Sequence, residues 1–365
     1  RAERQAQEMA RLAPSPLLPS SWSDAGGTAL QLAEGFGTEA AETGQKDRSW
    51  DDLRSELPRA VAYLLGALAL LTLGRHWIGS LPSRLSARAS EYSRAVVAFI
   101  TSLGQIVIPM IGIFLLVRGL KATNYPGAWT TPLLDAVPFA AVVLFSGTWL
   151  GRTLFPRRAI AYDTLQMTEA DRNKARRMTI TLSVIFAIHH ILATAILPAA
   201  GIYERPGVAS SRVPLDITEA SASVWHFVLI LLAGLELFRL GNVLRRLVKR
   251  EDAASLPYRH RLLSWTGTLT RIVVVIALAF AATGFTNLGN LFIWPWIMSV
   301  ALIGLLILLQ DFTADLFSMI KRGEEGARDG LIPLLIGFLL VLLTIPLFMM
   351  IWGSTGTDLG EMWSR

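Results

Sequence analysis

Ionisable side chains inside long apolar runs are the first candidates for chemistry in this sequence. His189 and His190 are neighbours in one such run, and Glu236 lies near the end of another. Adjacent residues on a helix point about 100° apart, so the two histidines are badly placed to ligate one metal ion together. We expect them to make hydrogen bonds between helices. Arg239 follows Glu236 by three residues, which predicts a structural ion pair rather than a functional carboxylate.

The usual catalytic patterns are absent from the sequence. It contains no phosphate-binding glycine loop, nucleophile elbow, paired-carboxylate motif or metal-ligand spacing. The chain has no cysteine, which excludes a thiol nucleophile, a disulfide framework and a cysteine metal site. These observations predict that the protein is not an enzyme and that it holds no metal or cofactor.

A dense cationic patch follows one of the apolar runs. It consists of Arg245, Arg246, Lys249 and Arg250. Patches of this kind beside a membrane attract anionic lipid headgroups by about 1 kcal/mol per residue. We therefore expect the patch to bind anionic lipid. A role in setting the orientation of the chain alone is the alternative.

A second pattern suggests contact with the bilayer surface. Phe312, Leu316 and Ile320 recur at helical spacing, while Asp311 and Asp315 are charged. This arrangement predicts a short amphipathic helix that lies along the membrane surface. Its apolar face would slide at the lipid boundary as the bilayer thins, so these three residues are candidates for coupling membrane tension to the protein.

Eight apolar runs supply the elements that must position these residues. Each is roughly 15 to 25 residues long, which suits the ~30 Å hydrocarbon core of a bilayer at about 1.5 Å per residue. The runs are 57–73, 95–117, 132–155, 178–199, 224–240, 272–286, 291–309 and 331–352. Of the 365 residues, 52% are hydrophobic and 17% are charged. We therefore expect an all-α polytopic integral membrane protein, with about eight transmembrane helices arranged as hairpins.

The regions outside these runs are polar. Residues 1–56 are rich in Gly, Ser, Thr and acidic side chains, and they predict an extramembrane tail or linker. Residues 57–352 form the transmembrane region, and 353–365 a short tail. Because the sequence starts with Arg1 and lacks a signal-peptide core, we expect a piece of a longer protein.

Basic residues give the expected orientation. The loops after the first, third, fifth and seventh runs hold four, seven, eight and three Lys or Arg, against five on the other side. By the positive-inside rule the richer side is cytoplasmic, and both termini lie outside. The net charge of +6 is thus a topology signal and does not indicate nucleic acid. Trp294, Trp296 and Trp352 fall near the outer face, where we expect them to anchor helices at the headgroups.

The last third of the chain resembles a known family. The stretch 308–317, LLQDFTADLF, is followed by Gly330-Leu331-Ile332-Pro333 and Ile351-Trp352-Gly353. Together they resemble the peripheral helices of the large members of the small-conductance mechanosensitive channel superfamily. The resemblance implies a bacterial inner-membrane protein that assembles as a homo-oligomer, a heptamer in that family, around a pore lined by a helix rich in Gly and Ala.

No run here has the small-residue face of such a pore helix. We therefore expect these spans to sense tension for a channel core that lies outside this chain. A self-contained transporter or a membrane scaffold of eight spans is the alternative. A transporter would show broken helices and paired ionisable groups near the membrane midplane.

Overall fold

The computed structural model describes residues 11–45, 50–156, 167–198, 212–246, 257–324 and 326–353. Every regular element in these ranges is a helix, and eight helical stretches are long and apolar enough to cross a membrane, which confirms the predicted fold class and count. The elements are α2 (Pro19–Gln45), α3 (Trp50–Ala69), η1 (Leu70–Gly74), α4 (Arg75–Arg88), α5 (Arg94–Ser102), α6 (Gly104–Ala122), α7 (Thr130–Leu154), α8 (Glu169–Ile191), η2 (Leu192–Ile196), α9 (Glu219–Arg246), α10 (Pro257–Thr283), α11 (Thr286–Ile320), η5 (Ala327–Asp329) and α12 (Leu331–Ile351).

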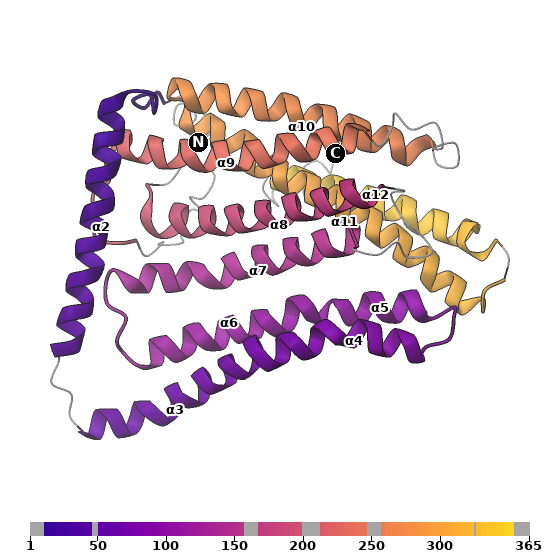
Figure 1. Ribbon diagram of the computed structural model, residues 1–365, viewed down its shortest axis with the longest axis horizontal. Helices are drawn as coiled ribbons and strands as arrows, with labels where there is room; N and C mark the ends of the chain where they lie inside the picture. Colours follow the sequence, from indigo (N-terminus) through magenta and orange to yellow (C-terminus); the bar gives the residue numbers. More distant parts are fainter. Residues whose placement is uncertain are drawn as a thin grey trace, which may run out of the picture.

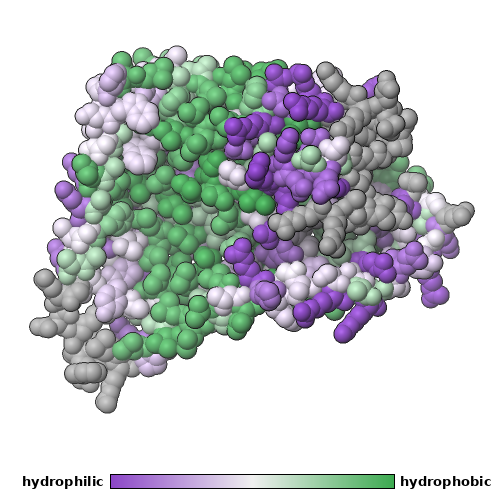
Figure 2. Space-filling view, viewed as in Figure 1, coloured by the Kyte–Doolittle hydropathy of each residue, from purple (hydrophilic) through white to green (hydrophobic). Residues whose placement is uncertain are grey.

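The long helices run side by side, and α2 lies across one end of them (Figure 1). We call the opposite end the basic end, because α7, α9 and α11 finish there close to Arg152, Arg246 and Lys321. Between the two ends, apolar side chains cover much of the face seen in Figure 2. An apolar belt of this kind is what lipid-facing helices present to a bilayer.

The main core lies among α7, α8, α9, α10 and α11, where buried apolar side chains form one continuous cluster. Within it, α9 and α10 approach each other closely at a pair of glycines. A Cβ added to Gly241 would lie 2.9 Å from the backbone oxygen of Gly267, and one added to Gly267 would lie 2.7 Å from the oxygen of Gly241. Small residues at such crossings let membrane helices pack backbone against backbone.

Helix α2 was not predicted from the sequence, which indicated a linker. Its buried positions follow helical spacing and include the small residues Ser21, Ala25 and Thr28. Farther along, Leu32 and Phe36 pack on a second apolar cluster that contains Ile196 and Val213. The narrow stripe of small side chains lets α2 lie close against the ends of the other helices.

A carboxylate on α2 caps the first turn of α7. The oxygens of Glu39 accept hydrogen bonds from the backbone N–H groups of Trp129 at 2.6 Å and Thr130 at 3.1 Å. Burial alone would raise the pKa of Glu39, but hydrogen bonds from Thr130, Trp129 and Gly127 outweigh burial and hold this pKa below its ordinary value of 4.5. A carboxylate at a helix N-terminus satisfies free N–H groups and also complements the helix dipole.

Glu39→Ala should therefore lower the free energy of unfolding at neutral pH by about 1 kcal/mol, the usual cost of losing a helix cap. The folded pKa is depressed, so the carboxylate stabilises the fold above pH 4.5 and loses its effect as the pH falls below that value. Melting temperatures of wild type and Glu39→Ala should differ at pH 7 and converge in acid. A difference that does not depend on pH would contradict the charged cap.

The expectation of a separate surface helix around Leu316 is wrong. Phe312, Leu316 and Ile320 belong to α11, a single helix of 35 residues. No glycine or proline occurs between Gly304 and Lys321, so nothing interrupts the backbone hydrogen bonds after the apolar run ends. The amphipathic stretch is the last part of a long spanning helix.

Candidate functional site

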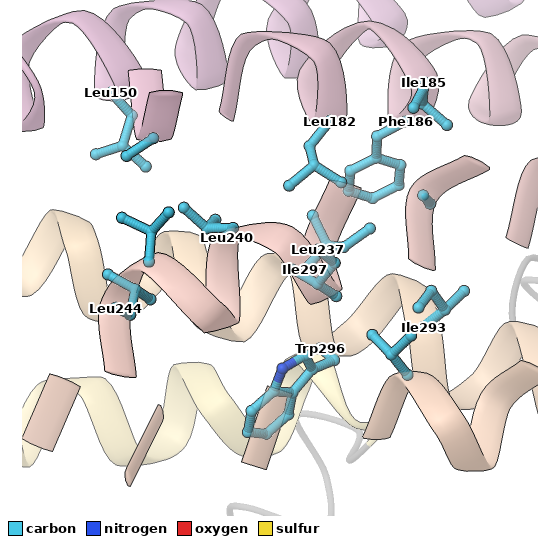
Figure 3. Close-up of a cluster of buried hydrophobic side chains, with 14 of the residues drawn as sticks. Leu150, Leu182, Ile185, Phe186, Leu237, Leu240, Leu244, Ile293, Trp296 and Ile297 are labelled. Atoms are coloured by element: carbon cyan, nitrogen blue, oxygen red, sulfur yellow. The ribbon is translucent and has the colours of Figure 1, made fainter. Parts of the chain in front are cut away.

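An apolar cavity of about 650 Å³ lies between one helical hairpin and the rest of the helices. We call residues 56–122, the two spans built from α3 to α6, the outer hairpin, and α7 to α11 the core helices. Phe99, Leu103 and Ile106 of the outer hairpin line one side of the cavity. The core helices line the rest, and Figure 3 shows several of these side chains facing one another across α7, α8, α9 and α11: Leu150, Leu182, Phe186, Leu237, Leu240, Leu244 and Ile297.

The outer hairpin is a unit of its own. Its two spans pack closely where Gly112 and Gly119 of α6 receive the side chains of Leu71 and Leu64. Toward the rest of the molecule it buries little: 11% of the apolar window of its first span is buried, and 22% of that of its second, against 50% for α9 and for α11. The outer hairpin is attached to the core through α6, which packs on α7, and through α5, which contacts α11.

An aromatic contact holds the outer hairpin to the core near the basic end. The ring of Phe99 on α5 stacks on Phe312 of α11 with centroids 4.5 Å apart, and it meets the edge of Trp149 on α7 at 5.8 Å. The Trp149 indole N–H donates to Ser102 Oγ at 2.9 Å. These four side chains, which we call the aromatic tie, join α5 to α7 and α11. Stacked aromatic pairs contribute about 0.5–1.5 kcal/mol beyond the area that they bury.

A second contact lies just beyond the aromatic tie. The ring of Tyr92, in the turn between α4 and α5, occupies the space where a side chain at Gly323 would lie. Gly323 has a φ of +79°, which favours glycine in this turn after α11. Arg328 pairs with Asp315 at 2.5 Å and closes the loop from α11 to α12.

The residues predicted to couple tension fall into different environments. Phe312 lies in the aromatic tie and Leu316 is half-buried, while Ile320 is 65% exposed at the end of α11. Of the predicted lipid-binding patch, Arg245 and Arg246 are exposed at the end of α9. Lys249 and Arg250 lie outside the described residues.

Other predictions have mixed outcomes. The ion pair is confirmed, since Arg239 Nη1 donates to Glu236 Oε1 at 2.9 Å. The prediction that Trp294 and Trp296 lie at the headgroups is wrong, because both are buried in the core. Their indole N–H groups donate to Asn290 Oδ1 and to Thr270 Oγ1.

Helix α12 is the least buried span. None of its most apolar window is buried, and it packs along the second half of α11. Trp352, just past its end, donates from its indole N–H to Ser299 Oγ at 3.1 Å. An apolar helix that is exposed along most of its surface is stable only in lipid or against another protein surface.

The comparisons with known proteins found no match: no family model, no curated protein and no solved structure matches the chain.

Proposed function

We propose that this chain is the peripheral tension-sensing region of a bacterial mechanosensitive ion channel. The chain passes bilayer tension to a pore. This pore is formed by sequence outside the chain in the assembled homo-oligomer. The observation that carries the proposal is the apolar cavity between the outer hairpin and the core helices, which Phe99 and Trp149 of the aromatic tie help to line. The sequence resemblance to the mechanosensitive superfamily adds to this support.

Membrane tension favours the conformation that occupies the larger area in the membrane. It shifts the equilibrium between two conformations only to the extent that their areas differ. An outer hairpin that swings away from α11 would enlarge the area of the protein in the membrane. Such a motion breaks the contacts of α5 with α11, which include the stacking of Phe99 on Phe312. Water does not readily fill an apolar cavity, so lipid acyl chains are the natural occupants of the space between the outer hairpin and the core helices.

One observation favours the alternative function of a transporter. His189 and His226, on different helices, are 0% and 3% exposed, and their ring centroids lie 6.0 Å apart. Ionisable groups paired inside a membrane bundle often mark a transport path. Substrate uptake into vesicles that His226→Phe abolishes would favour this alternative over tension sensing.

Leu316 offers a direct test of the proposed function. In the full-length channel, Leu316→Asp should shift the tension that opens the pore more than Leu316→Met. The carboxylate cannot remain against apolar surface, whereas methionine keeps the volume at a cost below about 1.5 kcal/mol. Patch recordings under graded suction measure the threshold. The chain reconstituted alone should pass no stretch-activated current, and such a current would contradict the proposal.

The orientation and the lipid partner form part of the same proposal. The basic end faces the cytoplasm, and Arg245 and Arg246 contact anionic headgroups there. Single cysteines at Ser210 and Ser255 of this cysteine-free chain should react differently with an impermeant thiol reagent in intact cells, with labelling at Ser210 alone. Labelling at Ser255 alone would contradict this orientation.

Replacing both Arg245 and Arg246 with glutamine should lower the amount of anionic lipid that co-purifies with the protein. An unchanged amount would contradict lipid binding by these two residues.

A further inference from the structure

Both spans of the outer hairpin are interrupted. In the first span, η1 is a π-helical turn between α3 and α4. In the second span, α5 ends at Ser102 and α6 begins at Gly104, and Pro109 follows inside α6. Proline lacks the N–H that would bond to the carbonyl of Gln105. Prolines and π-turns are the places where helices bend most often.

The two interruptions lie against each other. A Cβ added to Gly74 of η1 would lie 3.0 Å from Cγ2 of Ile108, and one added to Gly112 would lie 2.9 Å from a side chain of η1. Pro109 lies between Ile108 and Gly112 in α6, so the proline and the π-turn are at the same level of the hairpin. We call η1 together with residues 103–109 the joint.

Side-chain hydroxyls bond to backbone carbonyls at the joint in both spans. Thr72 Oγ1, within η1, donates to Leu68 O at 2.5 Å. Ser102 Oγ donates to Phe99 O at 2.7 Å just before α5 ends. Hydroxyls that bond back in this way often bend helices, and they satisfy backbone groups that a break inside a membrane would otherwise leave free.

The joint divides the hairpin into two halves with different neighbours. Helices α3 and α6 pack on each other and α6 packs on α7, whereas α4 and α5 pack on each other and α5 contacts α11. We call α3 and α6 the α2 half, and α4 and α5 the basic half, after the ends of the molecule toward which they lie (Figure 1). Lys121 pairs with Asp135 and joins the α2 half to α7. The aromatic tie holds the basic half.

The apolar cavity borders the joint. Leu103 and Ile106, which follow directly after α5, line the cavity between the outer hairpin and the core helices. Packed side chains therefore do not fill the space beside the second span at this level. A bend at the joint has to separate only the basic half from its neighbours, while α6 stays packed on α7.

We propose that the outer hairpin bends at the joint, so that the basic half moves away from α11 while the α2 half stays on α7. The joint rests on the proposed function, in which the hairpin leaves α11 under tension, and it names the part that moves. The first span has 33 residues, which would extend about 50 Å as one straight helix. Spans longer than the hydrocarbon thickness of about 30 Å respond to a thinner bilayer by tilting or kinking. The joint gives that kink a fixed position.

Distances from pulsed electron paramagnetic resonance test the joint without a channel current. Spin labels on cysteines at Ala87 of α4 and Thr268 of α10 follow the basic half, and labels at Leu65 of α3 and Thr268 follow the α2 half. All three positions are exposed, and the chain has no cysteine of its own. In the full-length protein without other cysteines, a change from long-chain to short-chain lipid should lengthen the 87–268 distance by about 5 Å, the length of one helical turn. The 65–268 distance should stay within about 2 Å, since the α2 half keeps its place.

The two distances separate the joint from the proposed function. Equal lengthening of both would overturn the joint, because the hairpin would then swing as one rigid body, but it would agree with a hairpin that responds to the bilayer. Two unchanged distances would overturn the joint and also contradict the movement on which the proposed function depends.

A variant at Pro109 tests the position of the bend. Pro109→Ala restores the backbone N–H that can bond to the carbonyl of Gln105, so it should cut the lengthening of the 87–268 distance by about half. Pro346→Ala, which changes a proline inside α12, is the matched control and should leave the lengthening as in the wild type. A wild-type 65–268 distance in each variant shows that it folds. Full lengthening in the Pro109→Ala protein would overturn the joint.

Discussion

A valine in place of Gly241 should push α9 away from α10 and leave little protein in a monodisperse folded form. The first side-chain carbon would lie 2.9 Å from the backbone oxygen of Gly267, and a backbone atom cannot rotate out of the way as a side chain can. We expect a loss of about 3 kcal/mol or more in the free energy of unfolding, at the upper end of overpacking effects. Size-exclusion profiles and melting temperatures in detergent measure the loss.

Two graded variants make this expectation specific. Gly241→Ala should destabilise less than valine because it adds a single carbon. Gly26→Ala is the matched control on α2, where no atom lies within 4 Å of an added Cβ, and it should stabilise the helix by up to about 1 kcal/mol. A Gly241→Val protein that melts at the wild-type temperature would show that α9 and α10 do not need this close approach.

The eight spans could be predicted because each is a continuous apolar run long enough to cross a bilayer, which is visible in the local sequence. The pair of Glu236 and Arg239 was predictable for the same reason, since both partners lie on one helical turn. The sequence could also have predicted that α11 continues through Phe312. Its charged residues suggested a break, but the lack of glycine and proline after Gly304 was the better signal.

Contacts between distant parts of the chain had no such signal. Helix α2 buries mostly small side chains, so its apolar pattern is weak, and its partners include Thr130 and Trp129 about ninety residues later. Trp294 and Trp296 looked like interfacial anchors by position, yet they are buried and bond to Asn290 and Thr270. An indole in a membrane protein satisfies its N–H either at the headgroups or on a neighbouring helix, and composition does not distinguish the two.

The contact most closely bound to the proposed function, Phe99 on Phe312, joins residues more than two hundred positions apart. Neither phenylalanine stands out among the apolar residues of its span. Phe312 was a candidate because of its place on an amphipathic stretch, whereas Phe99 was not a candidate at all. Only the packing of α5 on α11 brings the two rings together.

Cross-linking this contact should hold the proposed channel closed. Phe99→Cys and Phe312→Cys, introduced together into a full-length channel without other cysteines, would place two thiols across the aromatic tie, since this chain has none of its own. A short, cleavable bifunctional thiol reagent would then join the outer hairpin to α11. If tension opens the pore by separating the two, the joined protein cannot adopt the state of larger area. As a control, cysteines at Leu316 and Ile320 are one turn apart on α11, and joining them constrains only that helix.

Patch recordings on this pair of variants test tension sensing most directly. We predict that the cross-link between positions 99 and 312 raises the opening tension, that cleavage of the reagent restores it, and that the 316–320 cross-link leaves it unchanged. An opening tension that stays the same while gel shifts show the 99–312 cross-link to be complete would contradict the proposal that the outer hairpin transmits bilayer tension.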